Sequence, residues 1–156
     1  MGIDPGTATT GWGVVRTTKQ QFDYIEAGVI TTPANLALEK RLLIIHKDLK
    51  TLIKKYKPDA CALELLFFNT NAKTAMLVGQ ARGAAMLTLE ILHISLFSYT
   101  PLQVKMAITG YGRADKLQMQ KMVAQLLKLK QIPKPDDAAD ALAVALTHCF
   151  TKKVLK

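Results

Sequence analysis

The N-terminal third of the chain has the pattern of β-strands. Residues 11–17 (GWGVVRT) and 22–30 (FDYIEAGVI) are rich in β-branched and aromatic residues, which favour extended structure. The polar stretch 18–21 between them predicts a hairpin-type connection, and the short apolar start that ends at Asp4 predicts a strand before them. Because these three strands follow one another directly, we expect them to be antiparallel.

The middle of the chain alternates helices with buried strands. From Pro33, which we place near the first turn of a helix, apolar residues recur every three or four positions as far as Tyr56. Residues 60–66 (ACALELL) then predict a buried strand, 71–92 a helix and 94–99 another strand. Strands that alternate with helices usually run parallel to one another, so we expect these two to be parallel to the first strand.

Three helices are predicted in the C-terminal part: a short one that starts at Pro101, one over about 114–129 and one over about 136–150. Glycines and prolines separate them. The pattern therefore predicts an α/β fold, with a five-stranded mixed sheet whose first three strands are antiparallel and whose faces are flanked by helices. We expect residues 1–156 to form a single domain.

Composition agrees with an ordinary globular domain. The chain has 156 residues, of which 49% are hydrophobic, and this is enough to bury a substantial core. No uncharged run approaches the ~20 residues that a membrane span needs, and residues 1–4 do not look like the start of a signal peptide. With only two cysteines, the sequence predicts a cytoplasmic protein without disulfides.

The charge balance is strongly basic. Lysine and arginine number 21 and aspartate and glutamate 12, so the net charge is 21 − 12 = +9. This excess indicates a polyanionic partner such as nucleic acid, and the alternative is a basic surface that is simply solvated.

Four of the acidic residues occupy unusual positions. Asp4 precedes Pro5-Gly6, Glu64 lies inside an apolar strand, and Asp137 and Asp140 share one face of the last helix. A divalent cation such as Mg²⁺, which prefers carboxylate oxygens, would compensate all four. The alternatives are a turn role for Asp4, a salt bridge for Glu64 and helix capping for Asp136 and Asp137, and for that reason we leave Asp136 out of the site.

Four segments resemble the RuvC family of Holliday junction resolvases, in order and over nearly the whole chain. They are GIDPGTATTGWGVV (2–15), ALELLFFNTNAKTAMLVGQARG (62–83), PLQVKMAITGYGRADKLQMQKMV (101–123) and DDAADALAVALTHC (136–149). The resemblance implies a ribonuclease-H-like fold and a homodimer that binds four-way DNA junctions. It also implies symmetric cutting of two strands of like polarity during recombination and repair, with Mg²⁺ or Mn²⁺, and a RuvA–RuvB branch-migration complex as a partner.

The resemblance also implies roles for individual residues. The family's catalytic and metal-binding carboxylates fall on Asp4, Glu64, Asp137 and Asp140, although some relatives have His where this chain has Asp137. The family's Glu-x-x-Phe motif gives Phe67 the role of stacking on a junction base, and further DNA contacts fall on Phe68, Asn71, Arg82, Lys105 and Lys116.

Phosphodiester hydrolysis suits this set of acids. Two metal ions can activate a water and stabilise the leaving oxygen. We expect Asp4 to bridge two ions, Glu64 and Asp140 to hold one each, and Asp137 to complete the shell or orient the water. Gly79 and Gly83, four residues apart, would allow close packing, either inside the molecule or at the family's dimer interface.

One departure and two alternative functions remain. Relatives have several more apolar residues before the GIDPG segment, so we expect a short first strand here, which could weaken the placing of Asp4. The GIDPGTATTG segment also looks like the first phosphate loop of actin-like ATPases, but a second glycine-rich loop is missing. The other alternative is a protein that binds junctions without cutting them.

Overall fold

The computed structural model describes residues 1–18, 21–65 and 72–154. Its five strands form one sheet in the order β3-β2-β1-β4-β5. Strand β2 runs antiparallel to its neighbours β1 and β3, whereas β4 and β5 run parallel to β1. This arrangement confirms the predicted mixed sheet. The strands are β1 (Gly2–Asp4), β2 (Thr9–Thr17), β3 (Phe22–Thr31), β4 (Ala60–Glu64) and β5 (Ser95–Tyr99).

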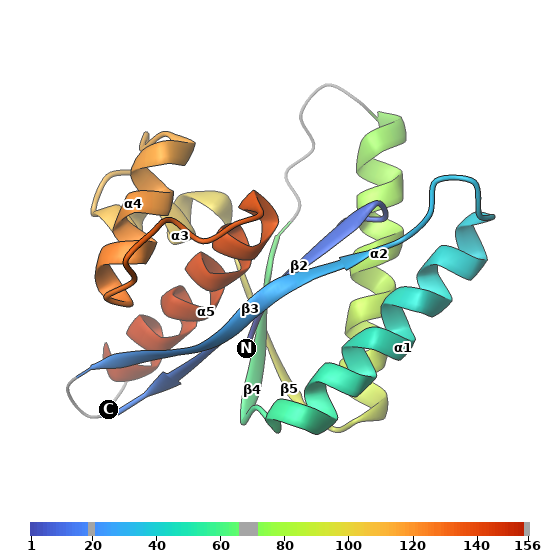
Figure 1. The fold of residues 1–156 in the computed structure, drawn as a ribbon, viewed down its shortest axis with the longest axis horizontal. Helices are drawn as coiled ribbons and strands as arrows, with labels where there is room; N and C mark the ends of the chain where they lie inside the picture. Colours follow the sequence, from blue (N-terminus) through green and yellow to red (C-terminus); the bar gives the residue numbers. More distant parts are fainter. Residues whose placement is uncertain (19–20, 66–71, 155–156) are drawn as a thin grey trace.

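Five helices in the described residues cover the two faces of this sheet. They are α1 (Leu38–Tyr56), α2 (Ala72–Ile91), α3 (Pro101–Thr109), α4 (Lys116–Leu126) and α5 (Asp136–Val154). Helices α1 and α2 lie together on one side, and α3, α4 and α5 lie on the other (Figure 1). None of the described helices is long and apolar enough to span a membrane.

The start of the first helix differs from the prediction. Helix α1 begins at Leu38, five residues after Pro33, and the amide of Leu36 donates to the carbonyl oxygen of Pro33 at 3.3 Å. Proline is as suitable for a turn as for the first helical position, because its fixed φ serves both. The placing of Pro33 in the first turn of the helix was therefore wrong, although the apolar face that ends at Tyr56 was predicted correctly.

Alternating side chains along β1 and β4 build two separate cores. Ile3, Cys61 and Leu63 point to the side of α1 and α2, where they pack with large apolar residues that include Ile45, Leu49 and Leu89. Ala62 points to the other side and packs with residues of α5 such as Leu142 and Leu146. Strand side chains alternate with a period of two, so Asp4 and Glu64 point to the α5 side as well.

Helix α5 lies directly on the backbone of β1 and β2. A Cβ added to Gly2 would lie 2.0 Å from the carbonyl oxygen of Ala141, and one added to Gly11 would lie 2.0 Å from that of Asp137. No other residue type fits at either position without a shift of the helix. These two glycines therefore fix how α5 crosses the sheet.

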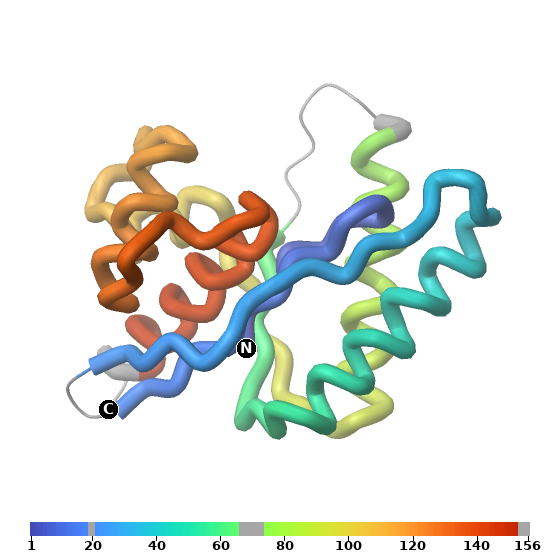
Figure 2. Tube along the Cα trace, in the orientation of Figure 1, coloured from blue at the N-terminus to red at the C-terminus, as the bar shows by residue number. Residues whose placement is uncertain are grey.

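The central strand is short but paired on both sides. Strand β1 has three residues and pairs with β2 and β4, and the amino group of Met1 donates to the carbonyl oxygen of Ala60 at 2.9 Å. The trace in Figure 2 shows the N-terminus in the middle of the molecule, between the two groups of helices. Asp4 is thus the last residue of a strand that pairs with β2 along all three of its residues.

Candidate active site

The sheet brings Asp4 and Glu64 to the same edge. Ile3 and Leu63 are direct partners of the parallel β1–β4 pair, and Asp4 and Glu64 are the next residues of their strands. After Asp4 the chain turns through Pro5-Gly6. The hydroxyl of the fully buried Thr10 donates to the carbonyl oxygen of Gly6 at 2.7 Å and fixes this turn.

The first turn of α5 brings Asp137 and Asp140 to the same place. Gly11 is the strand partner of Asp4, and its Cα lies directly under the backbone of Asp137. Asp140 follows three residues later on the same helix, and so lies on the same face. The structure therefore gathers the four predicted carboxylates at one end of the sheet.

The electrostatics of these acids show that they lie close together. Burial, followed by the negative charges of Asp140, Glu64 and Asp137, raises the pKa of Asp4 to about 7. Burial, followed by the charge of Asp140, also raises the pKa of Glu64. The pKa of Asp140 is raised by burial too, although the ammonium group of Lys116 opposes this. The site thus holds more negative charge than the protein compensates.

Two lysines border the carboxylates. The ammonium nitrogen of Lys116 lies 3.2 Å from Asp140 Oδ2 and 3.5 Å from Asp136 Oδ2. Lys105, on α3, opposes the upward shift in the pKa of Glu64 by its charge. Both lysines line a hollow of about 250 Å³ together with Glu64 and Asp140. A negatively charged substrate that enters this hollow therefore meets two lysines beside the acids.

The position of Lys116 is fixed by a capping box that the sequence interpretation did not use. Asp115 Oδ1 accepts from the amide of Gln118 at 2.8 Å, and Gln118 Oε1 accepts from the amide of Asp115 at 2.9 Å. This Asp-x-x-Gln pattern starts α4 and makes Lys116 its first residue. This pattern can be read from the sequence alone, and it predicts that Lys116 is the first residue of a helix.

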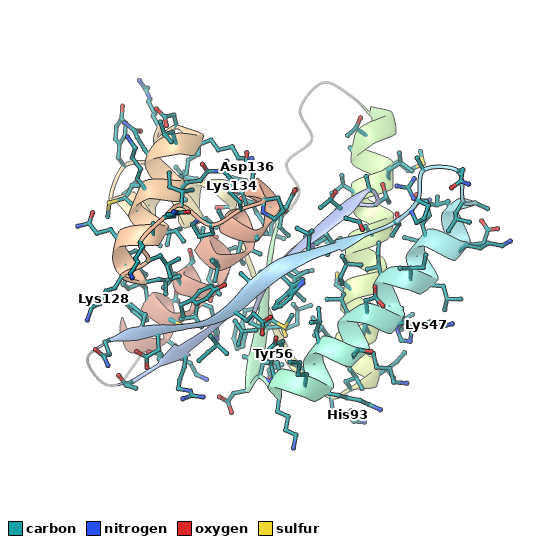
Figure 3. All side chains as sticks on the ribbon, viewed as in Figure 1. Lys47, Tyr56, His93, Lys128, Lys134 and Asp136 are labelled. Atoms are coloured by element: carbon teal, nitrogen blue, oxygen red, sulfur yellow. The ribbon has the colours of Figure 1, made fainter. Side chains whose placement is uncertain are left out.

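Asp136, which we left out of the site, is connected to it by ion pairs. Besides its contact with Lys116, Asp136 Oδ1 lies 3.1 Å from the ammonium nitrogen of Lys134. The two side chains lie close together at the start of α5 in Figure 3. Its position as the first residue of α5 agrees with the expected role near a helix start.

The remaining predicted DNA-contact residues fall into two groups. Arg82, on α2, donates from Nη2 to Ser98 Oγ at 2.9 Å and from Nε to the carbonyl oxygen of Glu64 at 3.4 Å. This side chain links the ends of β4 and β5. Phe67, Phe68 and Asn71 lie outside the described residues.

The donor set fits a divalent cation that keeps part of its water shell. In the described ranges, no three acidic, histidine or cysteine side chains are close enough to hold a metal ion by themselves. Mg²⁺ does not need such a cage, because it is often held by one or two carboxylates together with substrate phosphates and water. The oxygen-only donors and the uncompensated charge around Asp4 suit that ion.

Comparisons with known proteins agree with this geometry. The family model described as crossover junction endodeoxyribonuclease RuvC matches residues 1–148. A crossover junction endodeoxyribonuclease RuvC of Rubrobacter xylanophilus is 53% identical and covers 99% of this chain and 86% of its own length. The RuvC of Alkaliphilus oremlandii is 52% identical, with 97% of this chain and 92% of its own length covered.

Solved structures give the same result for the fold. Thermus thermophilus RuvC in complex with a Holliday junction substrate superposes with a TM-score of 0.93, at 34% identity, and covers 98% of this chain and 93% of the other. The expected ribonuclease-H-like fold is thereby confirmed, and the match decides against the actin-like ATPase alternative. The chain belongs to the RuvC family of crossover junction endodeoxyribonucleases.

Proposed function

We propose that this chain resolves Holliday junctions by symmetric, metal-dependent hydrolysis of two phosphodiester bonds in strands of like polarity. The observation that supports this most is the meeting of Asp4, Glu64, Asp137 and Asp140 beside a basic hollow. Nucleases of this family are metal-dependent, and the four carboxylates are the groups that would hold Mg²⁺ or Mn²⁺, with two ions per site.

The residues of the chain would divide the work as follows. When bound, the divalent ions would supply a nucleophilic water at neutral pH and neutralise charge on the leaving oxygen. The four carboxylates would hold the cations, and Gly11 and the turn after Asp4 keep the backbone of these acids fixed. Lys105 and Lys116 attract and orient the phosphate backbone along the wall of the hollow.

The test compares a mobile synthetic four-way junction with linear duplex of the same sequence, each with Mg²⁺ or EDTA. We expect paired symmetric nicks on the junction alone, and only with Mg²⁺. Equal cutting of the duplex would contradict junction specificity. Junction binding without any cutting would favour the alternative of a non-catalytic binding protein.

We further propose that the protein acts as a homodimer through the outer face of α2. The inner face of α2 is buried through Ala81, Ala85 and Leu89, whereas no neighbour among the described residues lies within 4 Å of a Cβ added to Gly83 on the outer face. Leu87 on that outer face is 60% exposed. A two-fold dimer presents two identical sites, which suits two symmetric cuts.

Leu87→Glu tests the dimer proposal. A charge at the centre of an apolar interface should weaken the dimer at least about 30-fold, as measured by analytical ultracentrifugation. Leu117→Glu, which changes an exposed leucine (52%) of α4 on the other side of the sheet, is the matched control and should leave the dimer intact. If Leu87→Glu stays as dimeric as the control, α2 is not the interface. A branch-migration complex of the RuvA–RuvB type stays a predicted partner of the dimer.

A further inference from the structure

The ammonium group of Lys116 contacts a carboxylate that belongs to the proposed metal site. Its nitrogen lies 3.2 Å from Oδ2 of Asp140, and the same nitrogen lies 3.5 Å from Oδ2 of Asp136. Asp140 is one of the four carboxylates assigned to the divalent cations, whereas Asp136 is not. One cationic side chain is thus shared between a metal-site acid and an acid beside the site.

We propose that Lys116 is an internal counter-ion that blocks Asp140 in the DNA-free protein and releases it when a DNA phosphate draws the ammonium group away. The inference rests on the proposed nuclease function. In this arrangement the substrate itself prepares the metal site, so that divalent cation and DNA bind more tightly together than either does alone.

The side chain of Lys116 is able to move in this way, whereas its backbone is not. The capping box of Asp115 and Gln118 fixes the first turn of α4, but the Lys116 side chain itself is 56% exposed. Exposed ion pairs are weak, typically less than about 1 kcal/mol each, so a phosphate can compete for the ammonium group. Asp136 offers a second partner that keeps Lys116 at the rim of the hollow.

Competition at Asp140 follows from the position of the ammonium group. The positive charges of the Lys116 ammonium group and of a divalent cation at Asp140 repel each other, so each weakens the binding of the other to this carboxylate. Lys116 also acts on Asp4, where its charge favours the ionised carboxylate. Coupling between two ligands is reciprocal, so the factor by which DNA tightens cation binding equals the factor by which the cation tightens DNA binding.

Lys105 provides a matched control on the same wall. It lines the same hollow and acts on Glu64 through its charge, but it takes part in no ion pair among the described residues. Removing Lys105 therefore removes one positive charge near the acids without freeing a carboxylate oxygen. The difference in cation affinity between Lys105→Gln and Lys116→Gln therefore reports the contact of Lys116 with Asp140, separately from the loss of one positive charge.

The first experiment measures Mn²⁺ binding to the DNA-free protein by the electron paramagnetic resonance signal of free Mn²⁺. We expect Lys116→Gln to bind Mn²⁺ about three- to tenfold more tightly than Lys105→Gln does. Lys116→Arg, which keeps the charge, should stay close to the unchanged protein. Thermal unfolding in EDTA shows whether each variant is folded.

The outcomes separate the inference from the function on which it rests. Equal affinities for Lys116→Gln and Lys105→Gln would overturn the inference, because Lys116 would then act only as one positive charge among others. If the unchanged protein and Asp4→Asn bind Mn²⁺ equally well, the proposed metal site itself is wrong.

The second experiment measures the coupling with DNA. Fluorescence anisotropy gives the Kd for a four-way junction in EDTA and in Ca²⁺, which takes oxygen ligands as Mg²⁺ does. The ratio of the two values should be at least about threefold smaller for Lys116→Gln than for Lys105→Gln. An equal ratio in the two variants would show that Lys116 does not connect the cation site to DNA.

Discussion

The two faces of the sheet hold their helices in different ways. On the side of α1 and α2, large side chains such as Ile3, Leu49 and Leu89 interdigitate in an ordinary apolar core. On the side of α5, Gly2 and Gly11 let the helix backbone rest directly on the strands. The carboxylates point to this second face, so the proposed chemistry lies where helix and strand backbones are in direct contact.

This difference has a physical basis. Side chains in a core can change rotamer and absorb a change of volume, at a cost that grows with the misfit. A helix backbone in contact with a strand backbone cannot absorb a change of volume in this way, because making room would move the whole helix or strand. A methyl group added to Gly2 or Gly11 would therefore have to displace α5, and with it Asp137 and Asp140.

The largest expected effects are on cleavage and on stability, and they differ between Asp4 and Ile3, two neighbouring residues of β1. Asp4→Asn should lower single-turnover junction cleavage at least about 10³-fold and leave the junction Kd within about threefold, since it removes a metal-holding charge but little volume. Ile3→Ala should instead lower the free energy of unfolding by about 3 kcal/mol, because Ile3 is fully buried among α1 and α2.

Denaturant unfolding and cleavage assays on both variants make this comparison. Cleavage by Asp4→Asn at the normal rate would remove Asp4 from the site. A fully folded Ile3→Ala that is as inactive as Asp4→Asn would show that the two faces are not separate in function.

A pair of glycine substitutions tests the same contrast between the faces. Gly11→Ala forces a Cβ to within 2.0 Å of the Asp137 carbonyl oxygen, so we expect a loss of about 3 kcal/mol in unfolding free energy and about 100-fold in cleavage. A Cβ added to Gly28 would lie nearest to the Trp12 ring, at 3.0 Å, so Gly28→Ala should cost about 1 kcal/mol or less, with little change in cleavage. Similar losses in both variants would contradict the rigid contact of α5.

The buried carboxylates of the α5 face should make stability depend on pH. The pKa of Asp4 is about 7 in the folded protein and near 3.8 without the fold, so the folded state binds more protons between these values. The free energy of unfolding in EDTA should therefore fall as pH rises from about 4 to about 7, with Asp4 contributing up to about 1.4 kcal/mol per pH unit and Glu64 and Asp140 adding in the same direction.

Urea unfolding at a series of pH values measures this dependence. Asp4→Asn should show a smaller slope than the unchanged protein, since the main titrating group is gone. Saturating Mg²⁺ should oppose the fall in stability, because the cation binds the ionised acids. An identical slope in Asp4→Asn would mean that Asp4 is not the buried acid of this face.

The smallest expected effect concerns the rim of the hollow. Lys105→Gln should make the salt dependence of junction binding shallower by about one unit in a plot of log Kd against log salt concentration, if Lys105 contacts one phosphate. Lys47, on α1 at the other side of the sheet, gives the control Lys47→Gln, which should leave the slope unchanged. Equal slopes for both variants would remove Lys105 from the DNA contacts.

Much of the fold could be predicted from the sequence because hydrophobic periodicity is a local signal. The β-branched and aromatic residues of 11–17 and 22–30 and the apolar face that ends at Tyr56 correspond closely to β2, β3 and α1. The start of α1 was wrong because Pro33 fits a turn as well as a helix. Element boundaries depend on hydrogen bonds and packing that a pattern does not contain.

The sequence by itself determined the strands and most of the helices, the types of the four site acids and the basic character of the chain. The tertiary structure alone decided how these acids meet: the β1–β4 register sets Asp4 near Glu64, and Gly11 lets Asp137 lie over the sheet edge. It also decided that Lys116 pairs with Asp140 and Asp136. These are contacts between residues far apart in the chain, and their distances follow from packing rather than from any local pattern.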